Sequence, residues 1–157
     1  MFKTISNRTI TYYGNEFTKE INRKDNKKHK INSIDELFNI LLKVWCRETA
    51  YPSCQQDYIQ ENDPSYGQCA ITATLVYDMF GGTIHKIKVD GGGTHYFNKF
   101  NGHYIDLTSD QFDLYNIPVN YENNAIVNRE YCGKNPDTQK RYKLLVKRIS
   151  EYLENNK

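Results

Sequence analysis

The clearest pattern of hydrophobic and polar positions lies in residues 31–46, INSIDELFNILLKVWC. Its apolar residues recur at intervals of three and four, which is the period of one face of a helix. Ser33, followed three residues later by Glu36, forms a capping-box pattern at the start of this stretch. The stretch therefore predicts an amphipathic helix, with these positions facing the core: Ile34, Leu37, Phe38, Leu41, Leu42 and Trp45.

A second helical stretch runs from about residue 65 to residue 80. It is apolar over much of its circumference, and Gly81 and Gly82 follow it as a stop signal. A helix that is apolar on nearly every side is expected in the interior of a domain. The pattern thus predicts a buried central helix. Residues 47–67, which separate the two helices, are rich in Pro, Asp, Asn and Gln and predict a long polar loop.

Segments that are typical of β-strands follow the central helix, at residues 83–89, 94–100 and 103–107. Asn101 and Gly102 between the last two are a strong signal for a two-residue hairpin turn. A final amphipathic helix is predicted over residues 136–153. Together these elements predict an α+β fold in which the central helix packs on an antiparallel β-sheet.

The length of 157 residues fits one domain with a core of its own. Residues 1–30 carry eight Lys or Arg against three Asp or Glu, whereas residues 31–128 are acidic. We expect residues 1–30 to form a basic, flexible N-terminal arm and residues 31–157 to form the domain. Such an arm could contact nucleic acid or a membrane surface, but no phosphate-reading motif accompanies the charge, so nucleic acid is not an expected partner.

The chain has no run of 18 apolar residues, and its first residues lack the apolar stretch of a secretory signal. We therefore expect a cytoplasmic protein without a membrane span. The cysteines at positions 46, 54, 69 and 132 contain no C-x-x-C pair, which argues against a zinc ribbon or a thioredoxin motif. No cofactor or metal is expected.

The hairpin turn fixes which side chains share a face of the sheet. If Asn101 and Gly102 are the two central turn residues, Phe100 lies opposite His103, and His95 and Asp106 become diagonal neighbours on one face. His103 then points to the other face. The register selects His95 as the histidine that a carboxylate can orient.

Cys69 stands near the start of the predicted central helix. A helix N-terminus favours a thiolate and can bind a developing oxyanion. Cys69, His95 and Asp106 are therefore the candidate catalytic residues. The plainer alternatives are an inert core cysteine and an ordinary Asp–His pair. A metal site made from Cys54, Cys69, His95 and His103 matches no common zinc spacing.

Four strings resemble the YunG-like family of small bacterial proteins: ETAYP (48–52), PSYGQCAITATLVYDMFGG (64–82), HYFN (95–98) and IDLTSDQF (105–112). The resemblance covers roughly residues 33–153. It implies a reduced relative of the papain and transglutaminase core, in which a helix-borne cysteine is followed by a histidine strand and an aspartate strand in that chain order.

By this resemblance Cys69 would be the nucleophile, His95 the base and Asp106 the orienting acid, and the backbone N–H of Cys69 would form part of an oxyanion hole. Gln68 is a candidate for the side-chain donor to that hole, and Gln55, Gln56 and Gln60 are open alternatives. The implied function is a thiol hydrolase that attacks an amide or ester carbonyl of a protein or peptide, as a cysteine peptidase, a deamidase or a transglutaminase-like enzyme. The alternative is a non-catalytic binding or regulatory protein that keeps the fold, or a defence-related effector with one protein partner.

Overall fold

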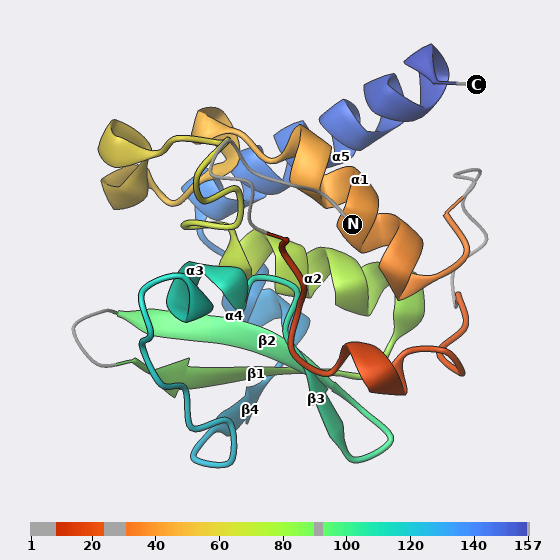
Figure 1. Cartoon of the computed structure of the whole chain (residues 1–157), viewed down its shortest axis with the longest axis vertical. Coiled ribbons are helices and arrows are strands. Elements are labelled where there is room, and N and C mark those ends of the chain that lie inside the picture. The colour runs from red at the N-terminus through yellow and green to blue at the C-terminus, as the bar shows by residue number, and fades with distance from the viewer. Residues whose placement is uncertain (1–8, 24–30, 90–92, 157) are drawn as a thin grey trace.

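The computed structural model describes residues 9–23, 31–89 and 93–156, and within them the chain forms an α+β fold (Figure 1). The helices are α1 (Ile34–Val44), α2 (Cys69–Phe80), α3 (Asp110–Asp113), α4 (Arg129–Gly133) and α5 (Pro136–Asn155). The strands are β1 (Thr83–Lys88), β2 (Thr94–Phe100), β3 (His103–Ile105) and β4 (Ala125–Val127). Short 3-10 helices cover Asn15–Phe17, Arg47–Thr49 and Pro52–Asp57.

Helix α1 begins where its capping pattern predicts. The Ser33 side chain accepts a hydrogen bond from the backbone N–H of Glu36 at 3.1 Å, which satisfies one of the free donors of the first turn. The six predicted core positions are all buried: five lie in α1, and the sixth, Trp45, follows it directly. The predicted amphipathic helix is confirmed.

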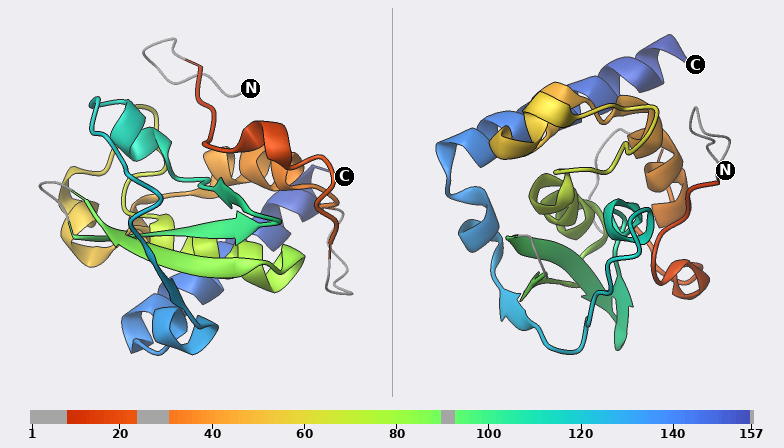
Figure 2. Two further views of the ribbon diagram at one scale, coloured as in Figure 1. Left: turned by 90° about the horizontal axis from the view of Figure 1, so that it is seen from below. Right: turned by 60° about the vertical axis from the view of Figure 1, so that its left-hand side comes forward.

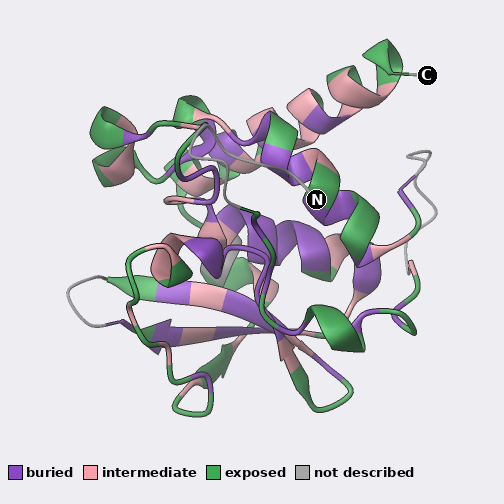
Figure 3. Cartoon of the chain, viewed as in Figure 1, coloured by how far each residue is buried: buried purple, intermediate pink, exposed green. Residues whose placement is uncertain are grey.

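Helix α2 is the buried centre of the molecule. It lies between the sheet on one side and α1 with α5 on the other, so that it is covered from both directions (Figures 2 and 3). Eight of its residues are buried. It begins at Cys69, later than the predicted position 65, because residues 63–68 form turns that lead into it. This later start places Cys69 at the first position of the helix.

Among the described residues the strands form one antiparallel sheet in the order β3-β2-β1-β4. The predicted hairpin is confirmed, because Phe100 pairs with His103 and Asn98 with Ile105. Asn101 and Gly102 have φ angles of 48° and 84°, the left-handed values that a type I′ turn requires. Strand β4, which pairs with β1, has no counterpart in the sequence prediction.

Residues 9–23 differ from the expected flexible arm. Ile10, Tyr12 and Ile21 are buried in the main core beside α1, so this part of the N-terminal segment belongs to the folded domain. Its apolar residues are too sparse to show a period in the sequence. The rest of the expected arm, residues 1–8 and 24–30, lies outside the described residues.

Candidate active site

Cys69 is half-buried and opens helix α2. The N–H groups of the first helical turn have no acceptor within the helix, and the helix dipole makes this end positive. The residue before it, Gln68, has no side-chain capping bond to the helix. A negative charge on the sulfur, or on an oxygen bound beside it, is therefore stabilised at this position.

His95, on β2, forms a close pair with Asp106, which directly follows β3. The distance from His95 Nε2 to Asp106 Oδ2 is 2.6 Å, and each residue is only 1% exposed. This is the diagonal contact that the hairpin register predicts. The β2–β3 ladder ends at Ile105, so Asp106 is held in place by contacts beyond the hairpin.

The second ring nitrogen of His95 is left for Cys69. Nδ1 is buried and has no hydrogen-bond partner among the described residues. Nε2 is engaged by Asp106, so Nδ1 is the nitrogen available to the thiol. Burial disfavours the charged ring, but the charge of Asp106 and its hydrogen bond outweigh burial and, together with Cys69, raise the pKa of His95 to about 10. The imidazolium is thus the favoured form of His95 at neutral pH.

Asp106 accepts four hydrogen bonds, two at each carboxylate oxygen. Oδ2 accepts from His95 and from the hydroxyl of Tyr121 at 2.7 Å. Oδ1 accepts from the backbone N–H and the hydroxyl of Thr108, at 3.1 and 3.2 Å. A buried carboxylate that is satisfied on every side has a fixed orientation, which in turn fixes the imidazole ring.

Two further contacts tie the helix that carries Cys69 to the segments that carry His95 and Asp106. The amide of Asn98 donates to the carbonyl of Ala73 in α2 at 3.0 Å. Gln111 accepts from the N–H of Gly67 at 3.3 Å and donates to the carbonyl of Thr108 at 3.0 Å. The three candidate residues therefore lie on elements that are bonded to one another.

The oxyanion side chain differs from the expectation. Gln68 is fully buried, and its Nε2 donates to the carbonyl of Cys46 at 3.0 Å while its Oε1 accepts from Thr49. The side chain is therefore committed to the loop after α1. Gln55 and Gln60 likewise donate to the carbonyls of Ala50 and Leu42. The backbone N–H of Cys69 remains the candidate donor.

The other histidines of the sheet lie apart from this arrangement. His103 is exposed, and its ring stacks on Phe17 with centroids 3.7 Å apart. His85 is buried and bonded to Thr83 and Asn124, each at 2.7 Å, and burial lowers its pKa below the ordinary value. Both side chains are thus engaged by other residues. For His103 the hairpin register indicates this, because it points that side chain to the other face of the sheet.

Several residues that shape the site were not found from the sequence. Thr108 carries a local signal, because an aspartate followed two residues later by a hydrogen-bonding N–H is an Asx-turn pattern. The bond of Gln111 to Gly67 and the bond of Tyr121 to Asp106 have no such signal, since each joins residues that are distant in the chain. Phe112, whose ring meets His95 edge-on with centroids 4.6 Å apart, is also fixed only by the fold.

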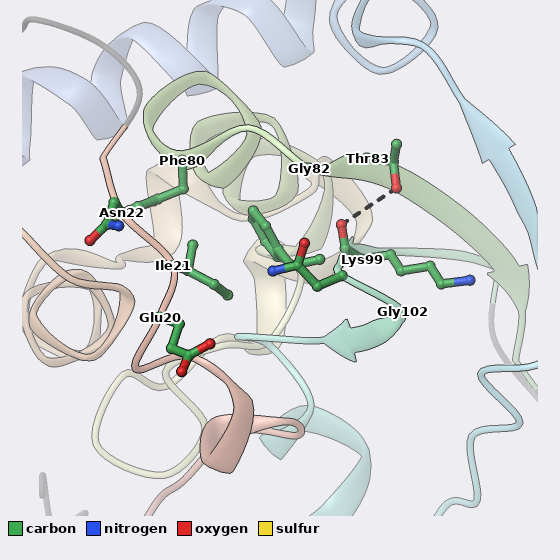
Figure 4. A pocket seen from close by; sticks show the side chains of 10 residues that line it. Glu20, Ile21, Asn22, Phe80, Gly82, Thr83, Lys99 and Gly102 are labelled. Carbon is green, nitrogen blue, oxygen red and sulfur yellow. Dashed lines mark hydrogen bonds between the residues drawn. The ribbon is translucent and has the colours of Figure 1, made fainter.

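A cavity of about 400 Å³ lies at the opposite end of α2, between the hairpin tip and residues 20–22 (Figure 4). Phe80 and Gly82 line it, and from Cys69 to Phe80 the helix extends about 16 Å. Its lining contains no cysteine or histidine, and its titratable side chains are Glu20 and Lys99. The cavity is therefore separate from Cys69, His95 and Asp106, none of which lines it.

Within residues 9–23, 31–89 and 93–156, no group of three or more His, Cys, Asp and Glu side chains could hold a metal ion. In the same ranges no helix has the length and apolar character needed to cross a membrane. Cys46, Cys54 and Cys69 are free thiols.

Comparisons with known proteins place this chain in a family. The uncharacterized protein YunG of Bacillus subtilis (strain 168) is 45% identical over 62 residues, which are 40% of this chain and 50% of the relative. The aligned part of the chain thus spans about half the length of that curated relative. No solved structure matches the chain. A family model described as YunG protein matches residues 33–154, and the chain therefore belongs to the YunG family.

Proposed function

We propose that this protein is a thiol hydrolase or acyltransferase that attacks an amide or ester carbonyl through Cys69. The observation that carries the proposal is His95, a fully buried imidazole. Asp106 holds one of its nitrogens, the other has no hydrogen-bond partner among the described residues, and Cys69 is near enough to contribute to the raised pKa of the ring. A structural histidine in the interior normally has both nitrogens satisfied. An open nitrogen next to a thiol is the arrangement that proton transfer requires.

The proposed reaction begins with the proton of the Cys69 thiol on His95 Nδ1 and the sulfur as thiolate. The thiolate forms a bond to the carbonyl carbon, and the carbonyl electron pair moves to oxygen, where the N-terminus of α2 and the N–H of Cys69 stabilise it. As the carbon–nitrogen or carbon–oxygen bond breaks, His95 gives its proton to the leaving group. A thioester on Cys69 remains.

The second half returns the protein to its starting state. Water or an amine attacks the thioester, His95 Nδ1 accepts the proton of the attacking group, and Cys69 leaves as thiolate. Asp106 keeps the proton of the other nitrogen, Nε2, in place and balances the imidazolium charge. Because burial alone would lower the pKa of His95, this balance supports a ring that can donate a proton at neutral pH.

We also infer that the domain is a reduced relative of the papain and transglutaminase core. The support is the chain order, with a cysteine at the start of a buried helix, a histidine on the following antiparallel hairpin and an aspartate after its second strand. The helix packs directly on that hairpin through Asn98 and Ala73. Protein or peptide substrates follow from this relationship and from the amide chemistry.

Acylation by p-nitrophenyl acetate tests the proposal without knowledge of the natural substrate. The expected result is a burst of nitrophenol together with one acetyl group on Cys69, located by peptide mass spectrometry. The variants Cys69→Ser and His95→Gln should abolish the burst, whereas Cys54→Ser, at another half-buried free thiol, should keep it.

Iodoacetamide labelling near neutral pH gives an independent measurement. Cys69 should be alkylated at least about tenfold faster than Cys46 or Cys54, and His95→Gln should remove most of that difference. Equal, slow labelling of the three thiols and no burst would overturn the enzyme proposal and favour a binding protein that keeps the fold.

A further inference from the structure

Residues 9–23, here called the N-terminal strap, lie before the region that the family model matches, yet they contact the residue that orients His95. The N–H of Asp106 donates to the carbonyl of Tyr13 at 3.0 Å, and the N–H of Tyr13 donates to the hydroxyl of Ser109 at 2.9 Å. Tyr13 and Asp106 thus form an antiparallel bridge. The strap continues the sheet at the point where β3 ends.

Gly14 makes this close docking possible. Its φ is 86°, and a Cβ atom there would lie 2.2 Å from the carbonyl oxygen of Tyr104. Any other residue would be strained by the backbone angle and would also collide with main-chain atoms that cannot move aside. The strap is therefore built to lie against the end of β3.

The side chain of Tyr13 reaches the same site by a second route. Its ring stacks on the ring of Tyr121, with centroids 4.3 Å apart and planes 23° apart. The hydroxyl of Tyr121 donates to Asp106 Oδ2, the oxygen that His95 also uses. Burial, followed by the charge of Asp106, raises the pKa of Tyr121, so the phenol remains protonated and acts as a donor.

These contacts hold both the main chain and the carboxylate of Asp106. Strand β3 is three residues long, and Asp106 has no ladder partner on β2, so the bridge to Tyr13 fixes its backbone. Without the Tyr121 hydroxyl, Oδ2 would keep the bond to His95 alone. Thr108 would still hold Oδ1, but the carboxylate would be less tightly fixed at Oδ2, and so would the imidazole that it orients.

We propose that the N-terminal strap completes the active site, with Tyr13 and Tyr121 as positioning residues that hold Asp106 so that His95 faces Cys69. This inference rests on the proposed function, because it assigns the strap a role in the same reaction. By this inference the site needs residues 9–23 in addition to the region that the family model matches, residues 33–154.

The test compares conservative variants of the full chain. Tyr121→Phe removes one hydroxyl, and Tyr13→Ala removes the stacked ring. Each should slow acylation of Cys69 by roughly tenfold or more, since a hydrogen bond to a buried charge is lost or misaligned. Tyr13→Phe keeps the ring and should restore most of the rate lost in Tyr13→Ala.

Tyr58→Phe is the matched control, because Tyr58 is also a buried tyrosine, and its hydroxyl donates to the carbonyl of Pro64 at 2.8 Å and not to Cys69, His95 or Asp106. It should lower the melting temperature without changing the acylation rate of the folded protein. If Tyr58→Phe slows acylation as much as Tyr121→Phe does, or if Tyr121→Phe reacts as the original protein does, the positioning role is refuted.

A spectroscopic measurement separates this inference from the proposed function. The Nε2 proton of His95, bonded to Asp106, can be followed by NMR of ¹⁵N-histidine-labelled protein. Its signal should broaden or shift in Tyr121→Phe and Tyr13→Ala but not in Tyr58→Phe. If the signal responds but neither the original protein nor any variant is acylated, the proposed reaction is refuted and the positioning role of Tyr13 and Tyr121 stands. If the signal does not respond, the positioning role is refuted.

Discussion

Replacing Asp106 by asparagine keeps the size of the side chain while it removes one charge and turns one acceptor into a donor. The N–H of Thr108 can only donate, so the remaining amide oxygen should stay with Thr108. The new NH₂ group then faces His95 Nε2, which must accept. The ring proton moves to Nδ1, and the nitrogen that faces Cys69 can no longer take a proton from the thiol.

The size of the effect follows from the burial of the pair. His95 and Asp106 are each 1% exposed, so solvent does not screen the loss, and breaking such a pair costs about 3–5 kcal/mol of stability. Without the carboxylate, burial dominates and the pKa of His95 falls. A catalytic imidazole held in the wrong tautomer loses about 10³- to 10⁴-fold in rate, and we expect a loss of this order for acylation of Cys69.

The assay is the burst of p-nitrophenol at fixed protein concentration, with urea unfolding to show that the variant is folded. Asp113→Asn is the matched control, because it makes the same chemical change at an exposed carboxylate in the following helix. It should retain the original rate within about threefold. A folded Asp106→Asn protein that acylates at the original rate would show that Asp106 does not orient His95.

Three further predictions concern stability. The pKa of His95 lies above its ordinary value because the charge of Asp106 outweighs burial. The pair's contribution to the free energy of unfolding is therefore fully present below about pH 6.5 and is lost as the pH rises toward about 10. Urea unfolding should show a less stable protein at pH 9 than at pH 6, and His95→Gln should show a smaller difference. Gly67→Ala should lose more stability than Gly102→Ala, since both have a positive φ but only Gly67 places the new Cβ 2.8 Å from the Cβ of Cys54; similar midpoints in urea would contradict the steric argument. Trp45→Phe should cost about 2 kcal/mol, because it leaves a gap in the core and removes the bond to the Thr72 hydroxyl, and a change below about 0.5 kcal/mol in urea unfolding would count against it.

The elements that the sequence predicted correctly are those whose signals are local. The cap of α1, the Asn101–Gly102 turn and the apolar surface of α2 each depend on residues within a few positions of one another. The turn also set the register, and the register brought His95 to Asp106. Strand β4 was missed because it is three residues long and is defined by its pairing with β1. The surroundings of Gln68 are not encoded locally, since only the packed loop shows that Cys46 and Thr49 engage it.

By itself the sequence determined the α+β fold, the buried central helix, and the pair His95 and Asp106, because helical period and hairpin geometry are encoded in neighbouring residues. Tertiary structure decided what surrounds that pair. The hydroxyl of Tyr121, the stacked ring of Tyr13 and the docking of Gly14 join segments that are far apart in the chain. Such contacts form only when the whole core is assembled, because their partners are chosen by packing and not by spacing along the sequence.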